Sequence, residues 1–116
     1  MSNLRNTVQL IGRLGDDPEV KELNGDKKLV KFSIATNETY TNVEGKKVTN
    51  TQWHQLVAWG GTAKIAEKYL KKGKEVAVEG RLNHRNYEDK DGMTRYFTEV
   101  VVNEIVMLGP NPDKTN

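Results

Sequence analysis

The order of the predicted secondary-structure elements constrains the fold of this chain more than any other feature. Five stretches are typical of β-strands, because apolar and polar residues alternate in them and turn-forming residues separate them. The second stretch shows the pattern most clearly, since Val30, Phe32 and Ile34 alternate with polar or small residues. The sequence therefore predicts strands at residues 7–13, 29–40, 50–59, 75–87 and 95–108.

One short helix is predicted between the third and fourth strands. Gly60 and Gly61 end the third strand, and Thr62 is suited to cap a helix that begins there. That helix is expected to run to about Leu70, and Gly73 follows it as a stop signal. Five strands with a helix between the third and the fourth match the strand order of an OB-fold. We therefore predict an all-β, five-stranded OB-fold barrel.

The chain has the size and composition of one domain. Its 116 residues suffice for one hydrophobic core, so residues 1–108 are assigned to the OB-fold domain. Residues 109–116 contain two prolines and no large apolar residue, and we expect them to be disordered. The absence of cysteine excludes disulfides and thiolate chemistry and fits a cytoplasmic protein. We find no signal-peptide pattern at the start and no apolar run of membrane-spanning length.

The residue types give little support for catalysis. His54 and His84 lack the spacing of metal ligands. Asp89 and Asp91 resemble the start of a calcium loop, but the remaining ligands of such a loop are missing. We therefore expect no catalytic residue, no metal and no cofactor, and a binding protein in place of an enzyme.

Both tryptophans of the chain fall on the third predicted strand. Because side chains alternate across a strand, Trp53 and Trp59 share one face. Leu56 and Ala58 on the other face suit a barrel interior, which leaves the two rings outside and roughly 20 Å apart. Exposed rings near lysines are typical of a platform for unpaired bases. The alternative is that the rings cover a subunit contact or a sheet surface.

Cations flank these rings in the predicted strand order. The formal net charge is only +2, so binding of a polyanion requires that basic side chains gather on one surface. Arg85 and Tyr87 share one face of the fourth strand. Lys46 and Lys47 lie near the tip of the hairpin that joins the second and third strands. Tyr40 ends the second strand on the parity of the core residues, so a bulge or a strong twist is needed to turn it outward.

Six short runs give the chain a resemblance to the bacterial single-stranded DNA-binding proteins, the SSB family. They occur in the family's order over about residues 5–108: GRLGDDPEV at 12–20, FSIATNE at 32–38, TQWH at 51–54, AEKYLKKG at 66–73, VEGRL at 78–82 and YFTEV at 96–100. The resemblance implies an OB-fold and a homotetramer, with a dimer as runner-up. It also implies sequence-tolerant binding of single-stranded DNA in replication, recombination and repair, in the nucleoid of a bacterial cytoplasm.

The resemblance also implies roles for individual residues. The family's base-stacking positions fall on Tyr40, Trp53, Trp59 and Tyr87. Its phosphate-binding positions fall on Lys21, Lys72 and Arg85 and, more loosely, on the hairpin residues Lys46 and Lys47. His54 falls where the family packs its subunits together, which agrees with its parity opposite the tryptophans.

The sequence departs from the family in two respects. Gln55, Gly61, Asn83 and Asn86 stand where members often carry cations, so we expect a weaker hold on phosphate than in strongly basic members. The family usually continues through a flexible linker to an acidic tip that ends in apolar residues, whereas this sequence ends in DKTN at 113–116. We therefore expect no protein partner recruited through such a tip.

Other functions stay open on sequence alone. An OB module for RNA or tRNA can be distinguished from a single-stranded DNA-binding protein by its relative affinity for RNA and DNA of equal length. A dimeric primosomal OB protein can be distinguished by the mass of its assembly. An OB-fold nuclease needs clustered carboxylates and a metal, and a purely structural subunit binds no oligonucleotide.

Overall fold

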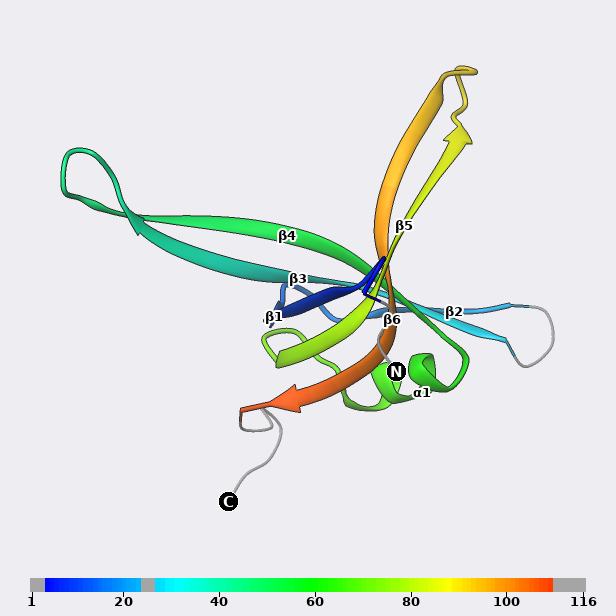
Figure 1. The fold of residues 1–116 in the computed structure, drawn as a ribbon. Helices are drawn as coiled ribbons and strands as arrows, with labels where there is room; N and C mark the ends of the chain where they lie inside the picture. Colours follow the sequence, from blue (N-terminus) through cyan, green and yellow to red (C-terminus); the bar gives the residue numbers. More distant parts are fainter. Residues whose placement is uncertain (1–3, 24–26, 110–116) are drawn as a thin grey trace.

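The computed structural model describes residues 4–23 and 27–109 and contains six strands and one helix over those ranges. Figure 1 shows the strands wrapped into a barrel, with two long hairpins extending from it. The elements are β1 (Val8–Leu14), β2 (Glu19–Glu22), β3 (Lys28–Thr41), β4 (Lys47–Trp59), α1 (Gly60–Tyr69), β5 (Glu75–Glu88) and β6 (Thr94–Leu108).

The barrel closes because β1 pairs with strands on both sides. The sheet order is β1-β5-β6-β4-β3-β2, and an additional β1–β3 pairing closes β1, β5, β6, β4 and β3 into a ring, with β2 attached to β3 outside it. β1 aligns with β5 from Val8 to Arg13 and with β3 at Arg13 and Leu14. β4 and β6 pair in parallel at Leu56 and Val57, and the other pairs are antiparallel. This topology confirms the predicted OB-fold barrel with one helix after its third long strand.

Two features of the fold differ from the sequence prediction. The sequence did not predict β2. All four of its residues are exposed, so no buried apolar residue alternates with polar ones, and the strand directly follows the turn around Pro18. It pairs with the start of β3, where Val20 aligns with Val30. The predicted cap at Thr62 is wrong, because α1 begins at Gly60 and its N-cap residue, Trp59, makes no side-chain capping bond. An N-terminus defined by backbone geometry alone has no capping residue to recognise.

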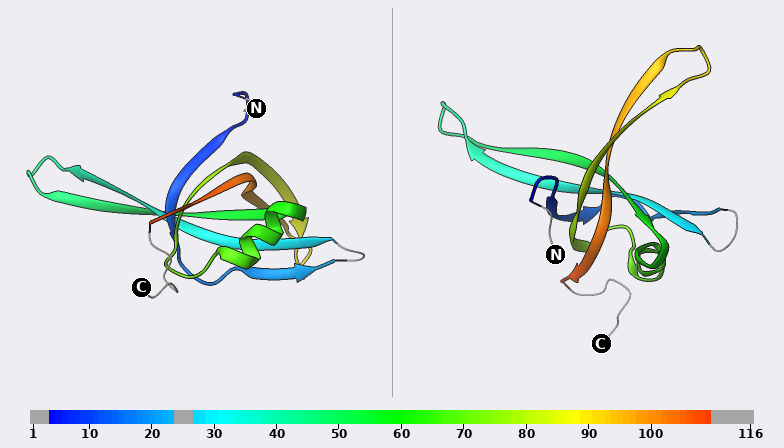
Figure 2. Two further views of the ribbon diagram at one scale, coloured as in Figure 1. Left: turned by 90° about the horizontal axis from the view of Figure 1, so that it is seen from below. Right: turned by 45° about the vertical axis from the view of Figure 1, so that its right-hand side comes forward.

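The core lies inside the barrel and beneath α1. Figure 2 shows α1 across one end of the barrel, away from the tips of both long hairpins. Gly12 allows β1 to cross β3 closely, since an added Cβ would lie 2.3 Å from the Ala35 carbonyl oxygen. The buried cluster comprises Leu14, Val30, Phe32, Ile34, Leu56, Ala58, Ala63, Ala66, Leu70, Val76, Val78, Val100 and Val102.

Two hairpin arms extend beyond the barrel. The β3–β4 arm (residues 37–51) keeps one continuous register to Thr41 and Lys47, and the β5–β6 arm (residues 82–99) continues to Glu88 and Thr94. Leu82 has the parity of the buried residues Val76 and Val78, but it is 41% exposed because its part of β5 already belongs to the arm. A register shift at Glu79/Gly80 precedes the arm.

Two sequence expectations concern the ends of the chain and membranes. Of the predicted disordered segment 109–116, residues 110–116 lie outside the described residues. Over the two described ranges, no helix is both long and apolar enough to cross a bilayer.

Candidate nucleic-acid interface

Trp53 and Trp59 lie on the outer face of β4, as the alternation predicts. Their exposed fractions are 57% and 47%, whereas Leu56 and Ala58 on the opposite pleat are buried. In the β3–β4 register, Trp53 aligns with Ala35 and Trp59 with Leu29. Both rings therefore stand on a strand that is held along its whole length by its neighbour, which fixes their spacing.

The position of the Trp53 ring depends on Gly15. An added Cβ on Gly15 would lie 2.4 Å from Cζ3 and 2.6 Å from Cη2 of the ring, so the indole rests against the glycine backbone. The Gly15 amide donates to the Ser33 carbonyl at 3.3 Å, which ties this turn to β3. The sequence alone did not indicate this contact, because Gly15 and Trp53 are 38 positions apart and the contact has no local signature.

Lys21 lies in the same cross-strand row as Trp59. Lys21 on β2 aligns with Leu29 on β3, and Leu29 aligns with Trp59 on β4. The Lys21 side chain is half exposed, and its Nζ is 3.7 Å from Glu19 Oε1. An ion pair this open to water is weak, so the ammonium remains available to an incoming anion.

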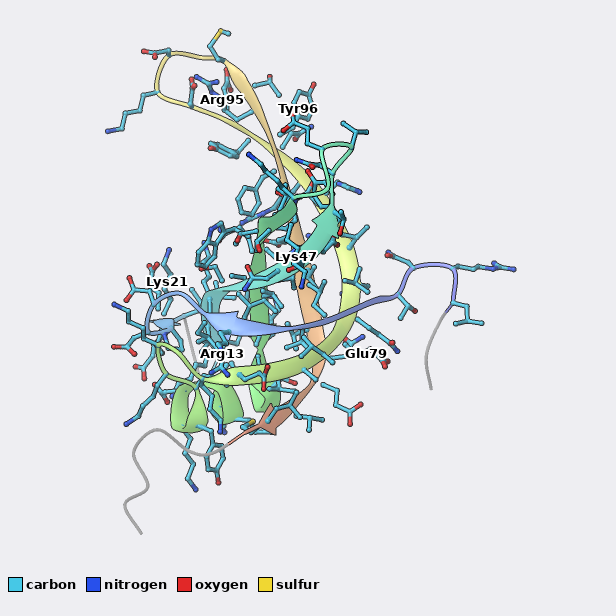
Figure 3. All side chains as sticks on the ribbon, turned by 90° about the vertical axis from the view of Figure 1, so that its left-hand side faces the viewer. Arg13, Lys21, Lys47, Glu79, Arg95 and Tyr96 are labelled. Atoms are coloured by element: carbon cyan, nitrogen blue, oxygen red, sulfur yellow. The ribbon has the colours of Figure 1, made fainter. Side chains whose placement is uncertain are left out.

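A second group of cations lies near Trp53. The Lys72 amide donates to Asp17 Oδ1 at 2.9 Å, which fixes the loop after α1 against the turn after β1. Arg13 aligns with Ala35, the cross-strand neighbour of Trp53, and its Nη1 donates to the Gly73 carbonyl at 3.1 Å. Arg13 is a cation of this surface that sequence reasoning did not select. Figure 3 shows Arg13 and Lys21 on one side of the view and Glu79 on the other.

The β3–β4 arm carries Tyr40, Lys46 and Lys47. Tyr40 is exposed. A bulge or a strong twist was expected to turn it outward, and the register contains no bulge, since it runs unbroken from Leu29 to Thr41. Tyr40 therefore keeps the pleat of the core residues and reaches solvent because the arm extends past the barrel. Lys47 is an even number of residues from both tryptophans on β4, so its side chain shares their pleat. Lys46 lies exposed in the turn.

The β5–β6 arm carries Arg85 and Tyr87 on one pleat. Tyr87 is 55% exposed and aligns with Arg95. Arg85 is not a free cation, because its Nη2 lies 3.2 Å from Glu99 Oε1. At the tip, Arg95 Nε donates to Asp89 Oδ2 at 2.8 Å, and this hydrogen bond is the main cause of an Asp89 carboxyl pKa below its usual value. Figure 3 shows Arg95 and Tyr96 near the tip of this arm.

His54 lies on the pleat opposite the tryptophans. It is half-buried, and its Nε2 is 2.9 Å from Thr36 Oγ1. His84 makes a similar contact across the β5–β6 arm, with Nδ1 2.8 Å from Thr98 Oγ1. Within residues 4–23 and 27–109, no group of three or more His, Asp or Glu side chains is arranged to hold a metal ion.

The site residues thus fall into three groups. Trp53, Trp59, Lys21 and Lys47 share the outer face of the β2–β3–β4 sheet, and Lys72 is tied to its edge through Asp17. Arg85 and Tyr87 stand on the other arm, and Tyr40 stands on the reverse pleat of its own arm.

A five-stranded Greek-key barrel with rings and cations on its outer face is an OB-fold domain, the class of barrel that binds oligonucleotides and oligosaccharides. The model of the Single-strand binding protein family matches residues 5–108. The chain belongs to this family.

Individual relatives agree with this family. The chain is 45% identical over 105 residues to single-stranded DNA-binding protein 1 of Chlorobaculum tepidum, covering 90% of this chain and 65% of that protein. It is 45% identical over 104 residues to a single-stranded DNA-binding protein of Neisseria meningitidis, covering 90% of this chain and 60% of that protein. The chain thus spans less than two thirds of the length of these two relatives.

A solved structure shares the fold over nearly its full length. It is the Plasmodium falciparum SSB in complex with single-stranded DNA, with a TM-score of 0.83 and 32% identity, covering 90% of this chain and 95% of that one. The single-stranded DNA binding protein from Thermus aquaticus, as a deletion mutant, matches with a TM-score of 0.79 and 28% identity, covering 90% of this chain and 50% of that one.

Proposed function

We propose that this chain binds single-stranded DNA with little sequence preference and catalyses no reaction. The observation that carries the proposal is the outer face of β4, where Trp53 and Trp59 stand about half exposed beside cations of the same sheet. Any base can stack on such a ring, so the affinity depends little on sequence, while lysine and arginine contact the phosphates. The names of the relatives support the same function.

The proposed roles of the residues follow from their positions. Stacking is assigned to Tyr40, Trp53, Trp59 and Tyr87. Phosphate contacts are assigned to Lys21, Lys46, Lys47, Lys72 and Arg85. Because the two arms and the β2–β3–β4 face point in different directions, a bound strand must bend around the barrel to reach all of them.

Assembly is part of the proposal. We assign the functional unit as a homotetramer, with a dimer as runner-up and with His54 at a subunit contact. An exposed apolar row supports an oligomer: Ile11, Ala77 and Val106 align across β1, β5 and β6 and line a depression of about 490 Å³. A row of this kind is typical of a surface that another protein copy covers.

In the cell, a coat of this kind protects unpaired DNA during replication, recombination and repair. We place that role in the cytoplasm, at the nucleoid.

The test is a titration of the chain with oligo(dT), oligo(U) and duplex DNA of equal length, followed by tryptophan fluorescence, with mass measured by light scattering. We expect strong quenching by oligo(dT), weaker binding of the other two and a mass above that of the monomer. Preference for oligo(U) would assign the chain to RNA, and no response to any oligonucleotide would refute the proposal.

A further inference from the structure

The Glu99 carboxylate lies at the base of the β5–β6 arm, beside one of the proposed phosphate-binding residues. Its side chain is only 9% exposed, whereas the Arg85 side chain is 51% exposed. Glu99 Oε1 accepts a hydrogen bond from Arg85 Nη2 at 3.2 Å, and its Oε2 accepts one from Asn83 Nδ2 at 3.3 Å. The Arg85 guanidinium carbon also lies 5.1 Å from the centroid of the Phe97 ring.

These contacts hold the guanidinium by one edge. Glu99 aligns with Asn83 and Phe97 with Arg85, so the acid and the ring are fixed by the β5–β6 register. A guanidinium has five N–H donors, and the solvent-facing donors of Arg85 remain able to bind phosphate. The buried carboxylate is costly to leave unpaired, so it keeps its contact when phosphate arrives.

We propose that Glu99 restrains phosphate binding by Arg85 and thereby sets how tightly the β5–β6 arm holds single-stranded DNA. A phosphate bound to Arg85 shares one guanidinium with the Glu99 carboxylate, and the two anions repel each other. The ion pair is also formally neutral, so Arg85 adds little to the long-range attraction of a polyanion. This inference rests on the proposed function.

The central variant is Glu99→Gln, which keeps the shape of the side chain and removes its charge. Its amide oxygen can still accept from Arg85 Nη2, whereas its NH2 group replaces the oxygen that faces Asn83, so the Asn83 amide must turn over to accept from it. We expect its affinity for oligo(dT) at low salt to rise on the order of three- to tenfold, with a steeper salt dependence. Glu88→Gln is the matched control, because Glu88 lies on the other pleat of the same arm and loses the same charge. We expect less than about a twofold change for this control.

A double-mutant cycle with Arg85→Gln tests whether Glu99 acts through Arg85. The gain from Glu99→Gln should disappear in the Arg85→Gln background. If the gain persists there, if Glu88→Gln reproduces it, or if Glu99→Gln weakens binding, the inference is wrong. In the unaltered protein, the NMR signals of the Arg85 side chain should shift on addition of oligo(dT), and unchanged signals would also overturn it.

The unaltered protein separates this inference from the proposed function. If oligo(dT) fails to quench its tryptophan fluorescence, the proposed function fails and the inference fails with it. If the unaltered protein binds and the affinity of Glu99→Gln is unchanged, only the inference is refuted.

Discussion

Replacing Trp53 by alanine should lower the affinity for DNA strongly and the free energy of unfolding moderately. The size of each effect follows from a different part of the ring's surroundings. Base–aromatic stacking in single-strand binding proteins, this family included, contributes about 1–3 kcal/mol per ring. At 1.4 kcal/mol per decade, Trp53→Ala should weaken the binding of oligo(dT) by roughly 5- to 150-fold.

The expected loss of stability follows from the covered part of the ring. Trp53 is 57% exposed, so the surface that it buries, part of it against Gly15, is about 100 Å². At about 25 cal/mol per Å², this burial contributes at most about 2.5 kcal/mol to the free energy of unfolding. Because the ring stands outside the barrel, Trp53→Ala should still fold.

The assay measures both quantities on one sample. Oligo(dT) affinity is measured by fluorescence anisotropy of labelled DNA, since the remaining Trp59 reports only part of the quenching, and stability is measured by urea unfolding. Trp53→Phe is the control, because its smaller ring should retain most of the stacking. An affinity loss below about twofold in Trp53→Ala, with the fold intact, would refute the assignment of Trp53 as a stacking residue.

Three further results are expected from other positions. Gly15→Ala should weaken oligo(dT) binding although Gly15 offers no side chain to DNA, because the new methyl group displaces the Trp53 ring; unchanged affinity would contradict this contact. Lys21→Ala should flatten the plot of log affinity against log salt by about 0.7, the value for one phosphate on a single strand, and an unchanged slope would exclude Lys21 from the phosphate path. His54→Tyr should lower the mass measured by light scattering at micromolar concentration more than it lowers the unfolding midpoint of the barrel, and a stable oligomer would remove His54 from the subunit contact.

Local alternation was sufficient to predict much of the barrel and the tryptophan face. β3 and β4 pair in one unbroken register, so the two-residue period of the sequence translates directly into faces, and Trp53 and Trp59 lie where it predicts. The same rule failed for Leu82, because alternation tells which pleat a residue is on and not where the barrel ends. Tyr40 shows the same limit, since it is exposed on the core-facing pleat.

The contacts that position the site could not be predicted, because they join residues that are distant in sequence. Gly15 meets Trp53 across 38 positions, and Asp17 holds the Lys72 amide across 55. The pairing of Arg85 with Glu99 depends on the register of two strands joined by a turn, and a one-residue slip would place them on opposite pleats. The sequence therefore indicates which side chains are on the surface, whereas the tertiary structure determines which of them are already held by another residue.

The way in which β1 closes the barrel determines the order in which this chain can fold during its synthesis. Val8 near the start of the described chain aligns with Gly80, so β1 has no β5 to pair with until most of the chain has been made. Before then, the sheet of β2, β3 and β4 exposes its apolar inner face, including Ile34 and Leu56, to the surroundings. At about 5–20 residues per second, synthesis of residues 75–108 takes roughly 2–7 seconds. During this interval the open edge and the apolar face of the sheet are exposed together, which makes the nascent chain prone to aggregate.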